Sequence, residues 1–412
     1  MKEVVDIEKI HGIRVKDHAL FIAVTFLFWS SQYVYSPILS SYLEQKGAGH
    51  LLIGLILGSY GITQLLIRFP LGMMSDYLSR RKLFVSLGLV MSMLSCMGLL
   101  MGDFGWILVS RLVSGVSAST WVVFTVLYSA YFASGNIAKA MSNIQFVTVA
   151  AQLLGMSASA FLVSGWGWHA PFWVALAFAM LGALLSLGIK DTESQSFKKP
   201  VGWDGLTAVV REPNLLKVSL LSTICHSTLF ITIFGFTPLQ AFKIGGTEEA
   251  ISMLVVAFMI PHAIATFLSG RLFMKRWGSW TTLTIGFAGS AVFTLATPFI
   301  HDLGLLCLTQ GINGFAQGLS FPLLLSLALR GISQEKRGTA MGFYQAFYSL
   351  GIFLGPFLAG WFNDGSDLTG GFLFSAATGL LAACLTVYWN RSDKSANAHA
   401  RDSRSASAAG SG

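Results

Sequence analysis

The sequence predicts an all-α integral membrane protein with twelve transmembrane helices in two pseudo-symmetric six-helix bundles. Three observations lead to this prediction: the apolar composition, a series of apolar runs of spanning length, and an internal repeat. Hydrophobic residues make up 54% of the 412 residues and charged residues only 11%, whereas a soluble domain carries about 25% charged residues. A soluble core could not bury so much apolar surface, but a bilayer can.

The apolar runs are each long enough to cross the hydrocarbon core as a helix. We assign them to helices because a spanning segment must satisfy its own backbone hydrogen bonds. The first run is too long and too aromatic for a cleavable signal peptide. The expected spans are residues 19–43, 51–75, 82–101, 105–131, 139–165, 170–189, 214–242, 249–273, 280–299, 303–329, 338–362 and 370–390.

The positive charges predict the orientation. All but four of the 27 lysines and arginines fall in the termini or in alternate loops on one side, the exceptions being Lys46, Lys243, Arg68 and Arg111. Cytoplasmic loops are enriched in these residues, so we expect both termini on the cytoplasmic side of the plasma (inner) membrane. The net charge of +8 therefore follows from topology, and a nucleic-acid partner need not be invoked.

The internal repeat divides the chain into halves. At an offset of 200 residues, Gln145 corresponds to Gln345, and at 201 residues Ser36-Pro37 corresponds to Thr237-Pro238. Repeated halves are the usual construction of secondary transporters, with a substrate site between them near the midplane. We expect an N-terminal bundle over residues 1–189, a cytoplasmic linker over 190–213, a C-terminal bundle over 214–390 and a disordered cytoplasmic tail over 391–412.

The stretch "GMMSDYLSRRK" between the second and third spans resembles the G-x-L-A-D-R-x-G-R-[RK] signature loop of the major facilitator superfamily. Four residues match it, Gly72, Asp76, Arg80 and Arg81, whereas Tyr77 and Ser79 replace a cation and a glycine. The resemblance extends over the whole chain and implies the twelve-helix fold of that family, with this loop as a latch on the inner gate. The alternative is ordinary anchoring by cytoplasmic cations.

Two further motifs resemble the same family. Arg111 and Gly115, in the fourth expected span, match the family's R-x-x-x-G pattern. In proton-linked members of the family, the matching arginine belongs to the coupling machinery. The alternative is an arginine that reaches the headgroups. The stretch "GIFLGPFLAG" in the eleventh expected span resembles the family's antiporter motif, which normally belongs to the fifth helix. From the two motifs we expect close helix packing at Gly115, Gly351, Gly355, Pro356 and Gly360.

The resemblance implies that helices 1, 2, 4, 5, 7, 8, 10 and 11 enclose the transport path. Polar residues at helical spacing on these helices are therefore candidates for the cavity lining. The alternative is that they form hydrogen bonds which join the helices of a bundle. The candidates are Trp29, Gln32, Gln145, Gln152, Gln310, Asn313, Gln317, Tyr344, Gln345 and Tyr348.

The ionisable groups inside the spans predict the chemistry of the cavity. All 19 aspartates and glutamates lie in loops, termini or helix ends, so His226 and His262 are the candidates for carrying a proton, with a buried packing role as the alternative. The resemblance adds Arg111 to the proton-coupling residues. Arg68 is a further cation, with snorkelling to the inner surface as the alternative reading. Such a cavity has neutral-to-positive potential and suits neutral or anionic solutes rather than lipophilic cations.

These observations favour a secondary active transporter that moves a small organic solute by alternating access, with proton-linked efflux preferred. Uptake or uniport of a small anionic metabolite is the alternative, and a polytopic membrane enzyme is a more remote one. The expected partners are a small-molecule substrate, protons and the lipid bilayer, with the chain acting as a monomer. The four cysteines show no paired spacing, and we expect no metal site, no cofactor and no enzymatic activity.

Overall fold

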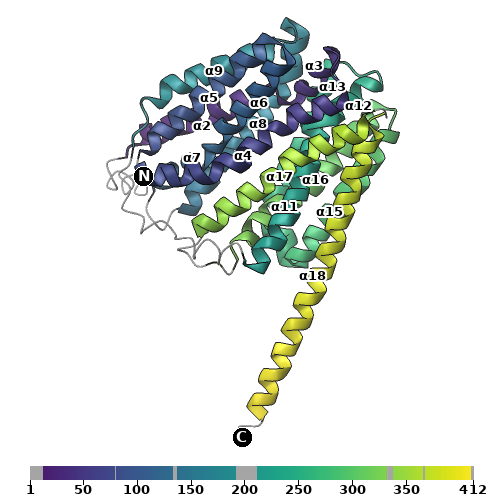
Figure 1. Ribbon diagram of the computed structural model, residues 1–412. Coiled ribbons are helices and arrows are strands. Elements are labelled where there is room, and N and C mark those ends of the chain that lie inside the picture. Colours follow the sequence, from purple (N-terminus) through teal and green to yellow (C-terminus); the bar gives the residue numbers. More distant parts are fainter. Residues whose placement is uncertain are drawn as a thin grey trace.

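A computed structural model (Figure 1) describes residues 13–78, 80–132, 137–191, 211–330, 332, 337–364 and 367–409 of the chain. The N-terminal half contains α2 (Val15–Tyr33), η1 (Ser36–Ile38), α3 (Leu39–Gln45), α4 (His50–Leu78), α5 (Arg81–Met101), α6 (Phe104–Ser119), α7 (Trp121–Ser129), α8 (Ile137–Trp166) and α9 (Ala170–Ser186). The C-terminal half contains α11 (Pro213–Ile231), η3 (Thr232–Phe236), α12 (Thr237–Lys243), α13 (Glu248–Leu268), η4 (Ser269–Phe273), α14 (Met274–Trp277), α15 (Ser279–Ala296), η5 (Thr297–Phe299), α16 (Leu303–Ala328), α17 (Arg337–Asn363) and α18 (Thr369–Ala409).

These elements form twelve membrane-crossing segments, and most of their bounds lie within a few residues of the predicted spans. Within the described residues, nine helical segments are long and apolar enough to cross a membrane, and α9 is a shorter apolar helix. The helices α16 and α17 complete the set. The predicted all-α fold of two six-helix bundles is confirmed.

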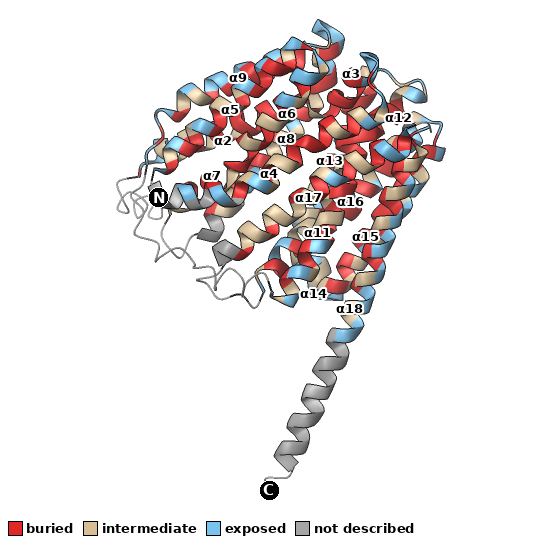
Figure 2. Cartoon of the chain, in the orientation of Figure 1, coloured by how far each residue is buried: buried red, intermediate tan, exposed pale blue. Residues whose placement is uncertain are grey.

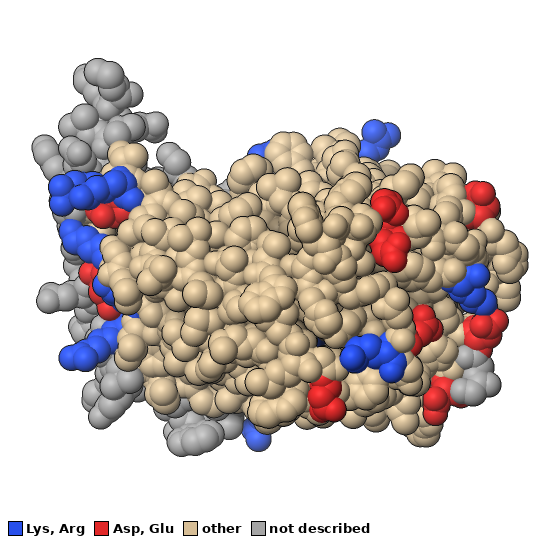
Figure 3. Space-filling model, turned by 90° about the horizontal axis from the view of Figure 1, so that it is seen from above, with Lys and Arg blue, Asp and Glu red and all other residues tan. Residues whose placement is uncertain are grey.

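The outer surface is apolar, as contact with lipid requires. Large hydrophobic side chains such as Leu94 on α5, Leu184 on α9 and Leu381 on α18 are exposed, while the bundle interiors are buried (Figure 2). Figure 3 shows charged side chains gathered toward the two ends of the molecule, with a broad and mostly uncharged surface between them. We call the end near Arg80, Arg211 and Arg391 the basic end, and the other the opposite end.

The repeat is visible in matching local structures. Ser36-Pro37 begins the 3₁₀ turn η1 in the first segment, and Thr237-Pro238 follows the π-helical turn η3 in the seventh. The two irregular turns lie against each other at the seam between the halves. Asp103 and Asp302 begin the fourth and tenth segments in the same way, each accepting a backbone N–H in the first turn of its helix, at 2.8 and 2.7 Å.

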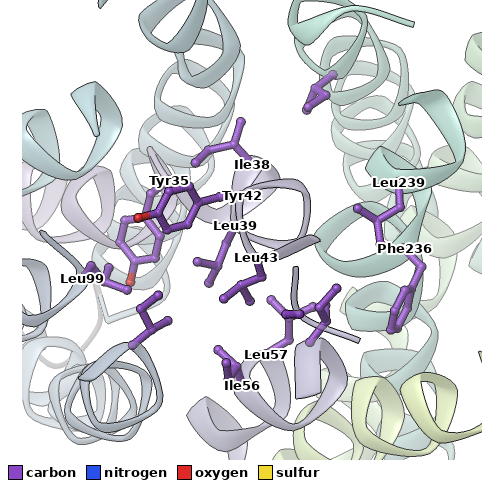
Figure 4. Close-up of a cluster of buried hydrophobic side chains, with 14 of the residues drawn as sticks. Tyr35, Ile38, Leu39, Tyr42, Leu43, Ile56, Leu57, Leu99, Phe236 and Leu239 are labelled. Atoms are coloured by element: carbon purple, nitrogen blue, oxygen red, sulfur yellow. The ribbon is translucent and has the colours of Figure 1, made fainter. Parts of the chain in front are cut away.

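The apolar cores show that the two halves are joined at the opposite end. One buried cluster there combines Tyr35, Leu39 and Leu57 of the N-terminal half with Phe236 and Leu239 of the C-terminal half (Figure 4). Toward the basic end the cores are separate. One cluster contains only residues 13–189 and another only residues 215–389.

The joined end depends on the close approach of α4 and α17. A Cβ atom at Gly54 would overlap the carbonyl oxygen of Pro356, and one at Gly58 would lie 2.5 Å from the carbonyl oxygen of Phe353. Small residues allow helix backbones to approach in a membrane, where lipid supplies no hydrophobic drive for association. The stretch from Gly54 to Gly61 on α4 is therefore the surface that closes this end.

The last helix extends beyond the twelfth predicted span. The helix α18 continues through Ala409 (Figure 1). Residues 391–409 contain neither glycine nor proline and are rich in alanine, a composition that favours a helix by intrinsic propensity. The predicted linker over 190–213 lies mostly outside the described residues.

We predict that Gly54→Leu opens the opposite end. The added side chain must separate α4 from α17, and overpacking of this kind costs about 1–3 kcal/mol, which shifts the conformational equilibrium about 5- to 150-fold. Distances between spin labels at positions 46 and 247, measured by pulsed electron resonance, should lengthen.

Gly165→Leu is the matched control for this variant. Gly165 also lies in a long helix, α8, but a Cβ atom there meets nothing within 4 Å. An unchanged distance distribution in Gly54→Leu, in protein that remains folded, would show that this contact does not hold the end closed.

Candidate functional site

Arg68 joins the two halves at the boundary between the closed and separated ends. It lies on α4, is only 5% exposed, and its Nη1 donates to the Tyr348 hydroxyl on α17 at 2.7 Å and to the Gln345 carbonyl at 3.4 Å. Its guanidinium carbon also lies 5.1 Å from the centre of the Tyr348 ring. Arg68 therefore does not snorkel to the membrane surface, because its charged group is bound at the seam.

Tyr348 also binds the first of the two predicted histidines. The imidazole of His226 on α11 stacks on the Tyr348 ring with centroids 3.9 Å apart and planes 2° apart. The Nδ1 of His226 donates to the Ser222 carbonyl at 2.8 Å, so Nε2 carries the lone pair. Arg68, Tyr348 and His226 thus form one continuous group that crosses the seam.

His262 lies on the other side of a shared phenylalanine. Both His226 and His262 meet the ring of Phe321 edge-on, at 4.9 and 5.6 Å between centroids. His262 also stacks on Phe258 at 5.6 Å, and its Nδ1 is buried with no hydrogen-bond partner among the described residues. The two histidines predicted to couple protons are therefore brought together within the C-terminal bundle.

Arg111 is separate from the histidines and lies inside the N-terminal bundle. It is 4% exposed, its Nη2 donates to the Leu57 carbonyl at 3.3 Å, and its guanidinium carbon lies 4.6 Å from the centre of the Tyr60 ring. Arg111 is therefore buried among the helices and does not reach the lipid headgroups, which was the alternative.

Aromatic rings from the two halves face each other across the seam, and the sequence reasoning missed them. Tyr33 stacks with Phe234 at 6.0 Å and an angle of 29°, and Tyr60 stacks with Phe230 at 6.1 Å and 21°. Gln152 lies beside the Tyr33 hydroxyl. The sequence did carry a signal for these rings, because they lie on the first, second and seventh spans, which the family resemblance places around the transport path.

The other candidates of the N-terminal half divide between interior and surface. Gln32 is buried and donates to Ser92 and Ser117 at 3.1 and 3.0 Å while accepting from Ser114 at 2.6 Å. It therefore holds α2 against α5 and α6. Trp29 is also buried, stacked on Tyr33 near the seam, whereas Gln145 is exposed on α8.

The three amides of the tenth segment do not face the seam, contrary to the expectation that they line the cavity. Asn313 accepts from Ser290 at 2.7 Å and from Gln317 at 3.1 Å, and it donates to Thr294 at 3.4 Å. Gln310 donates to Thr297 at 3.4 Å. Ser290, Thr294 and Thr297 belong to α15 and η5, so these amides join helices inside the C-terminal bundle.

The candidates of the eleventh segment lie together on the seam side of α17 and in the adjoining core. Tyr344 is buried and accepts from Ser222 at 2.9 Å, and its ring meets that of Tyr348 edge-on at 5.6 Å. Gln345 offers its backbone carbonyl to Arg68, and its side-chain Oε1 is buried without a partner.

The predicted latch lies mostly outside the described side chains. Gly72 and Asp76 occupy the last turns of α4, but their side chains are outside the described part of the structure. Arg80 is exposed immediately before α5, and Arg81 is buried at its first position. The latch remains a prediction.

The glycines predicted to pack helices all lie at close helix contacts. A Cβ atom at Gly115 would overlap Thr63 of α4, and one at Gly351 would overlap the Thr223 carbonyl of α11. At Gly355 it would lie 2.7 Å from the Ser227 hydroxyl, and at Gly360 it would overlap the His50 carbonyl. Pro356 lies between the last two, opposite Gly54.

Polar contacts accompany the apolar closure at the opposite end. The Nδ1 of His50 donates to the Asn363 carbonyl at 3.0 Å, and its Nε2 lies 3.6 Å from a carboxylate oxygen of Glu44. Ser252 of α13 donates to the Ser157 carbonyl of α8 at 2.6 Å. Each of the two helix pairs across the seam, α4–α17 and α8–α13, thus carries a polar link.

The guanidinium groups of Arg68 and Arg111 have no carboxylate partner among the described residues. Ion pairs of His50 with Glu44 and of Lys243 with Asp367 lie at the opposite end. No three metal-ligating side chains come together in the described part of the chain. The seam therefore offers guanidinium, imidazole, hydroxyl and aromatic groups for binding.

Two bundles of six helices, with irregular turns and the buried cation Arg68 at the seam between them, are typical of secondary membrane transporters. The family model for the Major Facilitator Superfamily matches residues 21–246 and again residues 220–410. The chain therefore belongs to this superfamily.

Named relatives agree with this assignment. The inner membrane transport protein YajR of Escherichia coli (strain K12) is 27% identical over 85% of this chain and 78% of its own. The quinolone resistance protein NorA of Staphylococcus aureus (strain COL) is 23% identical over 79% of this chain and 84% of its own. The crystal structure of the nucleoside transporter NupG superposes with a TM-score of 0.75 at 16% identity, over 91% of this chain and 99% of that one. These relatives are transporters, and this chain is a multi-pass membrane transporter rather than an enzyme.

We predict that Asn313→Ala lowers stability without selectively weakening solute binding. Removing the amide leaves Ser290 and Gln317 unpaired inside the bundle, and each lost bond costs about 0.6 kcal/mol in a membrane protein, so the expected total is about 1–2 kcal/mol. A lower melting temperature of the purified protein, by scanning fluorimetry, checks this. Gln145→Ala on the exposed face of α8 is the control, with no change expected. An Asn313→Ala variant that keeps native stability but binds solute more weakly would show that Asn313 lines the transport path.

Proposed function

We propose that the protein exports a small organic solute from the cytoplasm by alternating access, with a proton gradient as the energy source. One observation carries the direction of opening: the cores of the two bundles merge at the opposite end and remain separate toward the basic end. With the basic end in the cytoplasm, as the distribution of lysine and arginine favours, this is the state that receives solute from the cytoplasm. Rocking of the bundles about the seam would then release it outside.

The groups at the seam support a neutral or anionic solute. Arg68 and His226 lie there without a described carboxylate, and aromatic rings on both halves supply apolar walls. A permanent cation would face the Arg68 charge at low dielectric, where repulsion is strong. One relative is named for quinolone resistance and one similar structure for nucleoside transport, and both classes of solute contain a flat aromatic ring that would fit this site.

His226 supports proton coupling. Its imidazole stacks on the ring of Tyr348, whose hydroxyl binds Arg68, and imidazole is the side chain whose intrinsic pKa lies nearest to neutral pH. A proton on His226 would place a second cation across the Tyr348 ring from Arg68. Repulsion between them would favour separation of α4 from α17 and thereby link protonation to the conformational change.

Uptake of a small anionic metabolite is the second candidate, since a positive seam suits an anion in either direction. Flux measured separately in right-side-out and inside-out vesicles distinguishes the two.

We predict selective accumulation in energised inside-out vesicles that contain the protein. A radiolabelled quinolone or radiolabelled uridine should accumulate above protein-free vesicles, whereas ethidium, a permanent cation, should not. Filtration assays with each probe, with and without an uncoupler, provide the measurement. Strong ethidium accumulation would contradict the proposed potential, and accumulation in right-side-out vesicles alone would reverse the proposed direction.

We predict that His226→Asn abolishes accumulation driven by a pH gradient, by at least about tenfold, while solute exchange without a gradient persists. The reason is that asparagine keeps a polar group but cannot take up a proton near neutral pH. His301→Asn, at an exposed histidine outside the bundles, is the matched control. Gradient-driven accumulation that survives in His226→Asn would exclude this residue as the coupling group.

A further inference from the structure

The charge of Arg68 is buried but poorly compensated. Its side chain is 5% exposed, and its described partners are the neutral Tyr348 hydroxyl and the Gln345 carbonyl. Its Nε is buried with no acceptor among the described residues. An uncompensated buried charge is costly, and intramembrane ionisable residues commonly mark substrate pathways.

The free donors of Arg68 match a planar oxyanion. A guanidinium presents parallel N–H groups that fit the two oxygens of a carboxylate, and such bidentate bonds are roughly twice as strong as neutral ones. The parallel pair that includes Nη1 is formed with Nη2: the Nη1 acceptor is a phenol hydroxyl that can be exchanged, and no described residue accepts a hydrogen bond from Nη2. A carboxylate could therefore bind with little reorganisation.

The neighbouring rings restrict what carries that carboxylate. Tyr60 of the N-terminal half packs in one apolar cluster with Phe230 and Tyr348 of the C-terminal half, and Tyr33 packs with Phe230 and Phe234 in a neighbouring cluster. Tyr33 and Tyr60 stack against Phe234 and Phe230 at centroid distances of 6.0 and 6.1 Å. Small separations of the bundles would let a flat ring enter between such pairs, with favourable stacking on both faces.

We propose that Arg68 binds the carboxylate of a planar aromatic acid and that this acid takes the place of Tyr348 as the acceptor of Nη1. This inference rests on the proposed function in that the acid is the transported solute. The same exchange breaks the hydrogen bond between α4 and α17 at the boundary of the closed end. Binding of the acid thus releases the tie that the solute-free seam maintains.

The test uses a pair of probes that differ only in charge: 2-naphthoate and its neutral isostere 2-naphthamide. Equilibrium binding to protein in nanodiscs of zwitterionic lipid is measured by quenching of intrinsic tryptophan fluorescence, to which Trp29 beside Tyr33 contributes. The wild type should prefer naphthoate. Arg68→Gln should weaken naphthoate binding at least about tenfold, the size of a lost charge-assisted hydrogen bond, and leave naphthamide binding unchanged.

A second variant should strengthen naphthoate binding instead of weakening it. Tyr348→Phe removes the competing hydroxyl and keeps the ring, so naphthoate should bind about threefold to tenfold more tightly. Damage to the fold would weaken binding instead. Weaker naphthoate binding by folded Tyr348→Phe, or unchanged binding by Arg68→Gln, would overturn the proposal.

Arg111→Gln is the matched control, because Arg111 is equally buried and bonds within its own bundle. An equal loss of naphthoate preference in both arginine variants would indicate the general positive potential rather than a site at Arg68. Phosphatidylglycerol added to the nanodiscs should not displace naphthoate; displacement would assign the site to a lipid headgroup and overturn the proposal.

The binding assay is independent of transport direction and energy coupling. Naphthoate binding with the expected variant pattern but without vesicle accumulation would refute the proposed export and leave the carboxylate site intact. Accumulation of solutes in vesicles, together with naphthoate binding that does not depend on Arg68, would support the proposed export and refute the carboxylate site.

Discussion

The close contact of α4 with α17 at the opposite end is the constraint on which the rest of the structure depends. In a lipid bilayer the hydrophobic effect does not drive two helices together, so their association depends on packing. Gly54 and Gly58 let the α4 backbone reach Pro356 and Phe353 with no side chain between. From this contact toward the basic end, the cores change from one joined cluster to two separate clusters.

Polar groups are divided between the bundles and the seam in a way that suits rigid-body motion. Gln32 and Asn313 make several hydrogen bonds each, all within their own bundle. These bonds survive when the bundles move relative to each other. The described polar links across the seam are fewer, and those of Arg68 and His50 involve backbone carbonyls or a single hydroxyl. Motion between bundles therefore breaks few bonds.

The sequence predicted the spans and the repeat, since both follow from local composition and from correspondence along the chain. It could not predict which neighbour an amide meets. Gln310, Asn313 and Gln317 do share one helix face, as their spacing indicated, but that face meets α15 instead of the seam. Arg68 was ambiguous for the same reason: its acceptor Tyr348 lies 280 residues away, and hydropathy alone does not distinguish a seam from a lipid surface.

Arg68 is the place where a solute can influence the conformational equilibrium. A ligand shifts a two-state equilibrium only through contacts that differ between the states. The glycine contacts of the opposite end involve backbone and apolar atoms, which offer a solute little to bind. The acceptors of Arg68, in contrast, come from α17 and are available only while the two helices are together at the boundary. In any state that separates them the buried cation needs another acceptor, and a bound anion would supply it. The group that lacks full compensation here is therefore the one through which cargo and conformation can act on each other.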